Sequence, residues 1–266
     1  MTTVLIAVPR QASERRVALT PTVVGRLVDA GHAVEVEAGA GEQASFADRM
    51  FGDAGAEIVE TLSAASELIV VVGPPSMDRA TALPEGSALV GFLDPFGSGD
   101  LMRALAARRV TAFAMEEIPR TTLAQSMDAL SSQASAAGYH AVLLAAVSTP
   151  RIFPLLMTAA GTMPPVKVLV LGAGVAGLQA IATAKRLGAV VSAYDIRPQV
   201  QEQIESLGAR FVAGPVDESA ASASGYAREL GDDTQRRQQA ALAGPVADAD
   251  VVITTAQIPG LSLIHI

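Results

Sequence analysis

A chain of 266 residues is longer than one typical domain of about 100–200 residues requires, so it has room for two domains. Half of the residues are hydrophobic but only 4% are aromatic, which favours a core of Ala, Val, Leu and Ile between parallel sheets and covering helices. The formal net charge of −8 and the lack of a polybasic segment argue against nucleic-acid binding and against direct anchoring to lipid.

Apolar runs bounded by Gly, Pro or helix-like segments predict the strands of a first α/β domain, at 4–8, 33–37, 68–72, 88–93 and 110–114. Thr20 is the expected N-cap and Pro21 the expected first residue of a helix that continues to Asp29 and that Gly31 ends. Strands that alternate with helices predict a parallel sheet.

A helical pattern without proline covers 126–147 and is expected to bridge two domains. The alternation then resumes, with strands expected at 166–172, 190–195, 210–212 and 251–255 and helices at 175–187 and 199–207. The polar segment 214–244 predicts a surface loop that runs into a helix. We therefore predict an α/β fold with two domains and parallel sheets: an N-terminal domain at 1–130, and a Rossmann domain at 131–266 that includes the bridging helix.

One motif indicates chemistry. Gly172, Gly174 and Gly177 spell G-x-G-x-x-G between an apolar strand and a helix, and Asp195 ends the next strand. The first glycine permits a tight turn, the second lets the backbone approach a pyrophosphate, and the third lets the helix pack on the strand. The helix N-terminus then offers N–H donors to the phosphates. Strand, glycines, helix and acid in this order predict dinucleotide binding.

The alternative is a tight turn between strand and helix that binds no ligand. If a dinucleotide does bind, the Asp195 carboxylate would accept hydrogen bonds from the adenosine ribose and repel a 2′-phosphate, which favours NAD(H) over NADP(H). Arg197 is the opposing feature, because its cation could serve a 2′-phosphate.

The chain is poor in lysine and histidine, the two nitrogen bases that commonly move protons in enzymes. A dehydrogenase acting on an alcohol or amine normally positions His, Lys or a carboxylate as a general acid or base. The lysines are Lys167 and Lys185, beside the glycine motif, and the histidines are His32, His140 and His265, for which structural roles are the simpler explanation. Hydride transfer between two nicotinamides needs no such group, because the protein must only position the two rings and exclude water. The sequence suggests no metal site.

Several segments together resemble one family. They are ERRVALTP (14–21), GAGEQASFAD (39–48), IPRTTLAQSMDALSSQ (118–133), MTAAGTMPPVKVLVLGAGVAGLQAIATAKRLGA (157–189) with YDIRP, GYA (225–227) and TTAQIPG (254–260). The chain is thereby identified as resembling the NAD(H)-binding α subunits of proton-translocating NAD(P) transhydrogenase, in the alanine dehydrogenase/transhydrogenase superfamily.

The resemblance implies a function and partners. The chain would bind NAD(H) between its two domains and pass hydride from NADH to NADP⁺ on a partner domain, coupled to proton translocation. It would form a homodimer and dock on membrane-embedded subunits without a membrane span of its own. Its place would be cytoplasmic, on the cytoplasmic side of the inner membrane.

The resemblance also assigns site residues. Arg120, Gln125 and Asp128 would hold the nicotinamide end as the catalytic residues, although a helix-capping role for Ser126 and Asp128 is the simpler alternative. Gly225 and Tyr226 would lie on a loop that closes over the cofactor; the alternative is a solvated loop. The cofactor-binding set is Ser131, Gly172, Ala173, Gly174, Val175, Gly177, Asp195, Ile196, Arg197, Gly225, Tyr226 and Gln238.

Two other functions stay open. Alanine dehydrogenases share the E-x-R-V-A-x-T-P opening, in which Arg16 would grip a substrate carboxylate, but their catalytic lysine and histidine fall here on Gly73 and Asp94. We therefore expect Arg16 to have a structural role and to pair with an acid. A protein that binds NAD(H) without catalysis is the third possibility.

The ends of the chain and its lack of cysteine give further expectations. No secretory leader is visible at the N-terminus, and the absence of cysteine fits a reducing compartment, so we expect a cytosolic address. The resemblance ends near Gly260, before further Rossmann strands that the family would supply. We therefore expect the second domain to be incomplete at its C-terminus and the residues after Gly260 to be foreign to the native protein.

Overall fold

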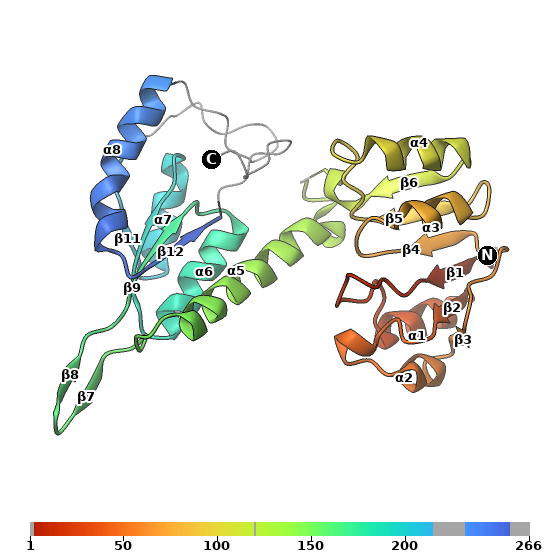
Figure 1. Cartoon of the computed structure of the whole chain (residues 1–266), viewed down its shortest axis with the longest axis horizontal. Coiled ribbons are helices and arrows are strands. Elements are labelled where there is room, and N and C mark those ends of the chain that lie inside the picture. The colour runs from red at the N-terminus through yellow and green to blue at the C-terminus, as the bar shows by residue number, and fades with distance from the viewer. Residues whose placement is uncertain (1–2, 120, 215–231, 256–266) are drawn as a thin grey trace. The chain divides into compact units, whose positions relative to one another are not determined.

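The structure is a computed structural model, and it describes residues 3–119, 121–214 and 232–255. The chain forms two compact units, Met1–Ile118 and Pro119–Ile266. The boundary expected after residue 130 lies further along the chain, in the first turn of the helix α5 (Ala129–Ser148). Each unit contains a parallel sheet with covering helices (Figure 1), so the predicted fold class is confirmed.

The sheet of unit 1 has the strand order β3-β2-β1-β4-β5-β6, and all of its neighbours pair in parallel. This is the order of a doubly wound fold, with its switch point between β1 and β4. The strands are β1 (Leu5–Val8), β2 (Ala33–Glu37), β3 (Glu57–Val59), β4 (Leu68–Val70), β5 (Ala88–Gly91) and β6 (Thr111–Ala114). The five strands that the sequence predicts are present, and β3 is an addition.

The two faces of this sheet have separate cores. Ile6 and Val8 of β1 pack in a cluster with helices α1 (Pro21–Asp29) and α2 (Asp48–Asp53), whereas Ala7 belongs to a cluster with α3 (Met77–Ala82) and α4 (Gly99–Ala107). Successive residues of a strand point to opposite faces, so a run that is apolar at every position serves both cores. The predicted helix at 21–29 is confirmed, but the Thr20 side chain makes no capping hydrogen bond.

The sheet of unit 2 has the order β11-β10-β9-β12 and is also parallel. Val168 and Val170 of β9 lie in one core with α5 and α6, and Leu169 lies in a second core with Tyr194 and α8, on the other face. The elements are β9 (Lys167–Leu171), α6 (Val175–Arg186), β10 (Val190–Tyr194), α7 (Gln201–Ser206), β11 (Arg210–Phe211), α8 (Asp232–Asp248) and β12 (Val251–Thr254).

Helix α5 packs closely against α6. A Cβ atom placed on Gly138 of α5 would collide with the carbonyl oxygen of Ala176, in the first turn of α6. The glycine therefore allows the two backbones to approach, and it fixes α5 against the beginning of α6. The sequence predicted the helix but did not explain this glycine.

A hairpin follows α5. Strands β7 (Leu156–Thr158) and β8 (Gly161–Met163) form an antiparallel pair (Figure 1). All six of their residues are exposed. The sequence did not predict this hairpin. Among the described helices, none is both long and apolar enough to span a membrane.

Candidate functional site

The glycine motif forms a tight turn between β9 and α6. Gly172 has φ = 94°, a value that strongly favours glycine. A Cβ atom on Gly177 would collide with the Gly172 carbonyl oxygen, whereas one on Gly174 would meet no atom within 4 Å. The turn thus needs Gly172 and Gly177 for its own packing and leaves open space at Gly174. This pattern matches the three roles that the sequence predicts.

The beginning of α6 offers backbone donors that the helix itself does not use. Gly174 is its N-cap, and the first hydrogen bond of the helix runs from the Leu178 amide to the Gly174 carbonyl oxygen at 2.8 Å. The amides of the first helical residues, Val175 to Gly177, therefore lack acceptors within the helix. Val175 is 41% exposed. Such an N-terminus suits a pyrophosphate, because its amides and the helix dipole both favour an anion.

Asp195 lies directly after β10 and is connected to this turn. Its Oδ2 accepts a hydrogen bond from the Ala173 amide at 2.7 Å, and its Oδ1 accepts from the Arg197 amide and Nε, both at 2.9 Å. Burial alone would raise the pKa of Asp195, but the hydrogen bonds from Arg197 and Ala173 outweigh it and leave the pKa below its ordinary value. Asp195 is therefore a charged, 5% exposed carboxylate beside the glycine turn.

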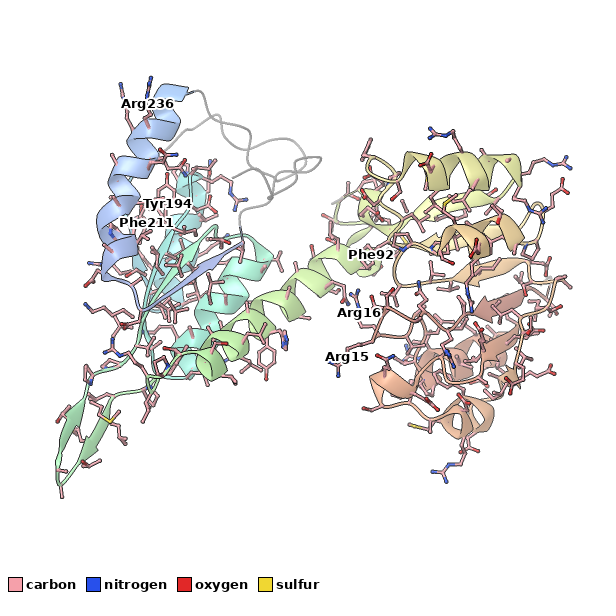
Figure 2. All side chains as sticks on the ribbon, viewed as in Figure 1. Arg15, Arg16, Phe92, Tyr194, Phe211 and Arg236 are labelled. Carbon is pink, nitrogen blue, oxygen red and sulfur yellow. The ribbon has the colours of Figure 1, made fainter. Side chains whose placement is uncertain are left out.

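Two neighbours support this arrangement from the sheet. Tyr194, the last residue of β10, is buried, and it shares a side-chain hydrogen bond with Gln238 of α8. Ile196 packs against the core cluster that contains Tyr194, the residue labelled in Figure 2. Burial and the nearby Asp195 carboxylate raise the pKa of Tyr194. Gln238, a predicted cofactor contact, thus bonds a residue adjacent to Asp195, the acid that is predicted to bind the ribose.

Thr255 is a site residue that the sequence reasoning missed. It follows β12, and its hydroxyl donates to the Gly172 carbonyl oxygen at 2.8 Å. Its amide donates to the Leu171 carbonyl oxygen, also at 2.8 Å. Thr255 therefore fixes the glycine turn from the neighbouring strand. The TTAQIPG segment contains this residue and was the signal that could have identified it.

Asp128 is the N-cap of α5. Its Oδ1 accepts from the Ser131 amide at 2.8 Å, and its Oδ2 accepts from the Ser131 hydroxyl at 2.6 Å. Gln125 is exposed in the short helical turn Gln125–Met127 before it. Between Asp128 and Gly138, which contacts the start of α6, ten residues of helix span about 15 Å. The segment that is predicted to hold the nicotinamide thus begins about 15 Å along α5 from the point where this helix meets the start of α6.

Three predicted residues, Arg120, Gly225 and Tyr226, lie outside the described residues. The structure brings together Gly172, Ala173, Gly174, Val175, Gly177, Asp195 and Arg197 around one turn, and it joins Asp128 to Ser131.

The residues that unit 1 offers for alanine dehydrogenase chemistry have other partners. Arg16, which Figure 2 labels, donates from Nε and Nη2 to the two carboxylate oxygens of Glu14, at 2.8 and 2.7 Å, so it pairs with an acid as expected. The Gly73 carbonyl oxygen accepts from the Gln11 side chain at 2.9 Å. Asp94, at φ = 47°, accepts from the Gly97 amide at 3.2 Å.

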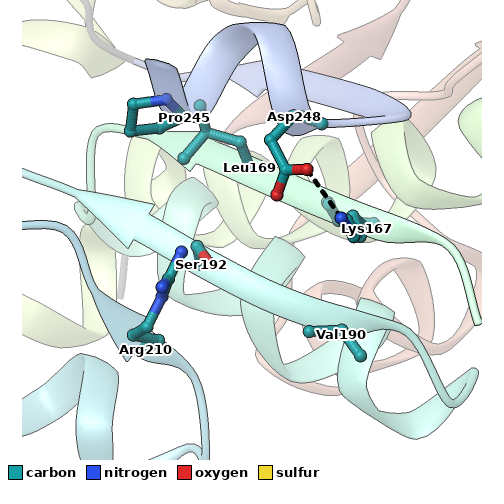
Figure 3. Close-up of a pocket in the computed structure, with 9 residues that line it drawn as sticks. Lys167, Leu169, Val190, Ser192, Arg210, Pro245 and Asp248 are labelled. Carbon is teal, nitrogen blue, oxygen red and sulfur yellow. Dashed lines mark hydrogen bonds and ion pairs between the residues drawn. The ribbon is translucent and has the colours of Figure 1, made fainter.

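A cavity of about 300 Å³ lies elsewhere in unit 2, between α8 and the strands β9 to β11 (Figure 3). Lys167 and Val190, the first residues of β9 and β10, line it, and Lys167 Nζ bonds Asp248 at 2.6 Å. It is thus at the amino-terminal side of the strands, whereas dinucleotides bind at the carboxyl ends. Within the described residues, no group of three or more His, Cys, Asp or Glu side chains could hold a metal ion.

Comparison with known families covers nearly the whole chain. Residues 7–137 match the model "Alanine dehydrogenase/PNT, N-terminal domain", and residues 141–263 match "Alanine dehydrogenase/PNT, C-terminal domain". An NAD(P) transhydrogenase subunit alpha protein of Rhodospirillum rubrum is 46% identical, over 96% of this chain and 70% of that protein. The alanine dehydrogenase of Mycolicibacterium smegmatis is 31% identical, over 76% of this chain and 56% of that protein.

A solved structure agrees. The crystal structure of transhydrogenase from Sinorhizobium meliloti superimposes with a TM-score of 0.83 and 41% identity, over 97% of this chain and 71% of that chain. The resemblance and the enzyme class predicted from the sequence, an NAD(P) transhydrogenase α subunit, are thereby confirmed. The predicted cofactors, NAD(H) and NADP(H), are those of the family. With both of its domains matched, the chain belongs to the alanine dehydrogenase/PNT family.

Proposed function

We propose that this chain is the NAD(H)-binding component of a proton-translocating transhydrogenase. It binds NADH on the glycine turn of unit 2 and passes hydride to NADP⁺ bound on a partner domain. Membrane-embedded subunits couple this transfer to proton translocation. The observation that supports the proposal most directly is the turn itself, in which Gly174 faces open space and the Asp195 carboxylate is bonded to the Ala173 amide.

Different residues of this chain bind different parts of the dinucleotide. The amides of Val175 to Gly177 receive the pyrophosphate, and the Asp195 carboxylate receives the adenosine ribose. The negative charge of Asp195 repels a 2′-phosphate, so NADH is preferred over NADPH. Gly225 and Tyr226, in the segment between β11 and α8, contact the bound cofactor together with Gln238 of α8.

Arg120, Gln125 and Asp128 orient the nicotinamide. The capping bonds between Asp128 and Ser131 make the start of α5 rigid, so capping and orienting are compatible roles. The nicotinamide ring of bound NADH is the hydride donor. The carbon atoms that exchange hydride need no accompanying proton transfer, so the protein contributes position and the exclusion of water.

The test is direct hydride transfer. The purified chain is mixed with a separately purified NADP(H)-binding transhydrogenase domain, NADH and an NADP⁺ analogue, and formation of the reduced analogue is followed by its absorbance. Transfer that requires both proteins supports the proposal. Tight NADH binding without any transfer would favour the alternative of a protein that binds NAD(H) without catalysis.

Alanine dehydrogenase activity is the second candidate, because the family models and the Mycolicibacterium smegmatis relative include that enzyme. The first 166 residues contain no lysine, and Gly73 and Asp94 stand where that chemistry needs lysine and histidine. We therefore expect no oxidation of NADH when the chain is given pyruvate and ammonia. Formation of alanine would reverse the ranking of the two functions.

The proposed assembly is a homodimer that docks on membrane-embedded subunits at the cytoplasmic side of the inner membrane. In this arrangement the chain reaches the membrane through its partners. The low content of basic residues supports it, because the chain has no polybasic segment for direct binding to anionic lipid.

A further inference from the structure

The acid expected to bind the adenosine ribose has no acceptor site left. The Asp195 Oδ2 accepts from the Ala173 amide at 2.7 Å and from Arg197 Nη2 at 3.0 Å. The Oδ1 accepts from the amide and from Nε of Arg197, both at 2.9 Å. A carboxylate offers about four lone-pair sites, so these four bonds saturate it.

The four donors differ in their freedom to move. The amides of Ala173 and Arg197 belong to the backbone of the glycine turn and of the segment that leaves β10. The donors Nε and Nη2 belong to a long side chain that can rotate away. A ribose diol also binds by donating hydroxyl hydrogens to the carboxylate. It can therefore gain acceptor sites only from those that the Arg197 guanidinium uses.

We propose that Arg197 occupies the ribose position on Asp195 in the nucleotide-free protein, and that NAD(H) must displace it to bind. This inference rests on the proposed NAD(H) site and adds a residue that sets its affinity and selectivity. The sequence predicted Arg197 as a cofactor contact; the geometry makes it an internal competitor of the cofactor. Arg197 is thus a positioning residue, since it acts on the ribose through Asp195.

The ion pair between Arg197 and Asp195 is sheltered enough from solvent to compete with the ribose. The side chains of Arg197 and Asp195 are only 20% and 6% exposed, so water screens their attraction poorly. When a binding-competent state is a minor fraction of the molecules, the apparent dissociation constant rises in inverse proportion to that fraction. If one molecule in ten had Arg197 displaced, NADH would bind about tenfold more weakly than to a site without the competitor.

The pairing also affects the choice of nucleotide. While Arg197 is bound to Asp195, the two charges cancel and the carboxylate repels a 2′-phosphate less. When Arg197 is displaced, its cation is available near the same position. Removing the guanidinium should therefore strengthen the binding of NADH and not that of NADPH, which increases the selectivity for NADH.

The experiment compares Arg197→Met with the wild type. Methionine keeps a long apolar side chain but has no donor. We expect Arg197→Met to bind NADH and 5′-AMP about 3- to 30-fold more tightly than the wild type does. Its affinity for nicotinamide mononucleotide should be unchanged, and its affinity for NADPH should not increase. NADH fluorescence and calorimetry measure these affinities. The matched control is Arg186→Met, which removes an exposed arginine at the end of α6 and should leave all four affinities as they are.

The outcomes separate this inference from the proposed function. If neither the wild type nor Arg186→Met binds NADH or 5′-AMP, the proposed site is wrong. If the wild type binds NADH and Arg197→Met binds it equally or more weakly, the competitor role is wrong.

A measurement on the wild type needs no variant to fold. The Arg197 Nε–H resonance, observed by ¹⁵N NMR, should be protected from exchange with water in the free protein. It should lose that protection when 5′-AMP is added. Unchanged protection at saturating 5′-AMP would show that the arginine stays on Asp195 and would overturn the inference.

Discussion

Gly174 contributes to the candidate site through the side chain that it lacks. An added Cβ would meet no protein atom within 4 Å, so Gly174→Ala should fold normally. The same methyl group would enter the space that the pyrophosphate needs. We expect NADH to bind at least about tenfold more weakly, a loss of about 1.4 kcal/mol, as measured by nucleotide fluorescence.

Gly177→Ala is the control for this prediction. Its Cβ would collide with the Gly172 carbonyl oxygen and lie 2.8 Å from the Thr255 hydroxyl, so the turn itself should be strained. We expect a lower free energy of unfolding, by about 1–3 kcal/mol, as for other overpacked sites. Undiminished NADH affinity in Gly174→Ala would contradict the assignment of the open space to the phosphates.

Asp195 should make the stability of the protein depend on pH. Its pKa is lowered in the folded state, so its stabilising effect is complete above the pKa of an unfolded aspartate, about 3.9, and is lost as the pH falls through the lower folded value. The variant Asp195→Asn lacks this dependence. We expect wild type and variant to differ most in urea unfolding at pH 6 and to converge below about pH 4. A constant difference from pH 6 to pH 3 would contradict the pairing.

At this scale, the sequence predicts the residues better than their contacts. The glycine spacing and Asp195 follow from local rules of backbone geometry and charge, which a sequence displays directly. The bonds from Ala173 and Thr255 depend on how three strands align. Those contacts are set by tertiary packing, so spacing along the chain does not reveal them.

The segment before α5 allows capping and positioning to be separated. Asparagine caps helices about as well as aspartate, so Asp128→Asn should retain the free energy of unfolding. The variant removes the charge that we expect to act on the nicotinamide. Hydride transfer should slow by roughly 5- to 150-fold, about 1–3 kcal/mol, with little change in NADH affinity. An unchanged rate of transfer would leave Asp128 with the capping role alone.

The contact between α5 and α6 gives a second prediction for a single element. In an open helix position, Gly→Ala stabilises by up to about 1 kcal/mol. At Gly138 the added Cβ would collide with the Ala176 carbonyl oxygen, so Gly138→Ala should lower the melting temperature instead. Gly52→Ala in α2, where no atom lies within 4 Å, is the matched control and should not lower it. Equal effects of the two substitutions would contradict the close packing.

The elements that the sequence missed have a common cause. Strand β3 has three residues, and β7 and β8 have three each, which is too short for a periodic pattern to stand out. Strand β4 is as short and β11 is shorter, yet both were predicted, because a longer apolar run (68–72) contains β4 and glycines at 208 and 214 flank β11. The alternation of apolar strands and helices was therefore enough to predict both sheets, but not the hairpin between them.

At the scale of the whole molecule, the two units share an architecture and differ in chemistry. Both sheets place the first strand between the second and the fourth, so each unit has a switch point beside its first strand. In unit 1, β1 is followed by Pro9, Arg10 and Gln11, whereas in unit 2 β9 is followed by the glycine turn. Only the second arrangement opens a helix N-terminus to a phosphate, so the fold alone would not have located the site.

The β7–β8 hairpin is a candidate interface for the predicted homodimer. A two-stranded hairpin is marginally stable by itself, yet this one exposes apolar side chains, with Met157 73% and Met163 43% exposed. Met157 and Met163 also lie on opposite faces, because Met157 is paired with Thr162 and Met163 with Leu156. Burying both faces against a second copy would remove this surface from water.

We therefore expect the wild type to be a dimer by light scattering, and Met157→Lys/Met163→Lys to be a monomer with its NADH affinity retained. Val147→Lys, which places one lysine on an 87% exposed residue of α5, is the control and should stay dimeric. A wild type that is monomeric at every concentration would contradict the predicted homodimer, whereas a double variant that remains dimeric would place the interface elsewhere.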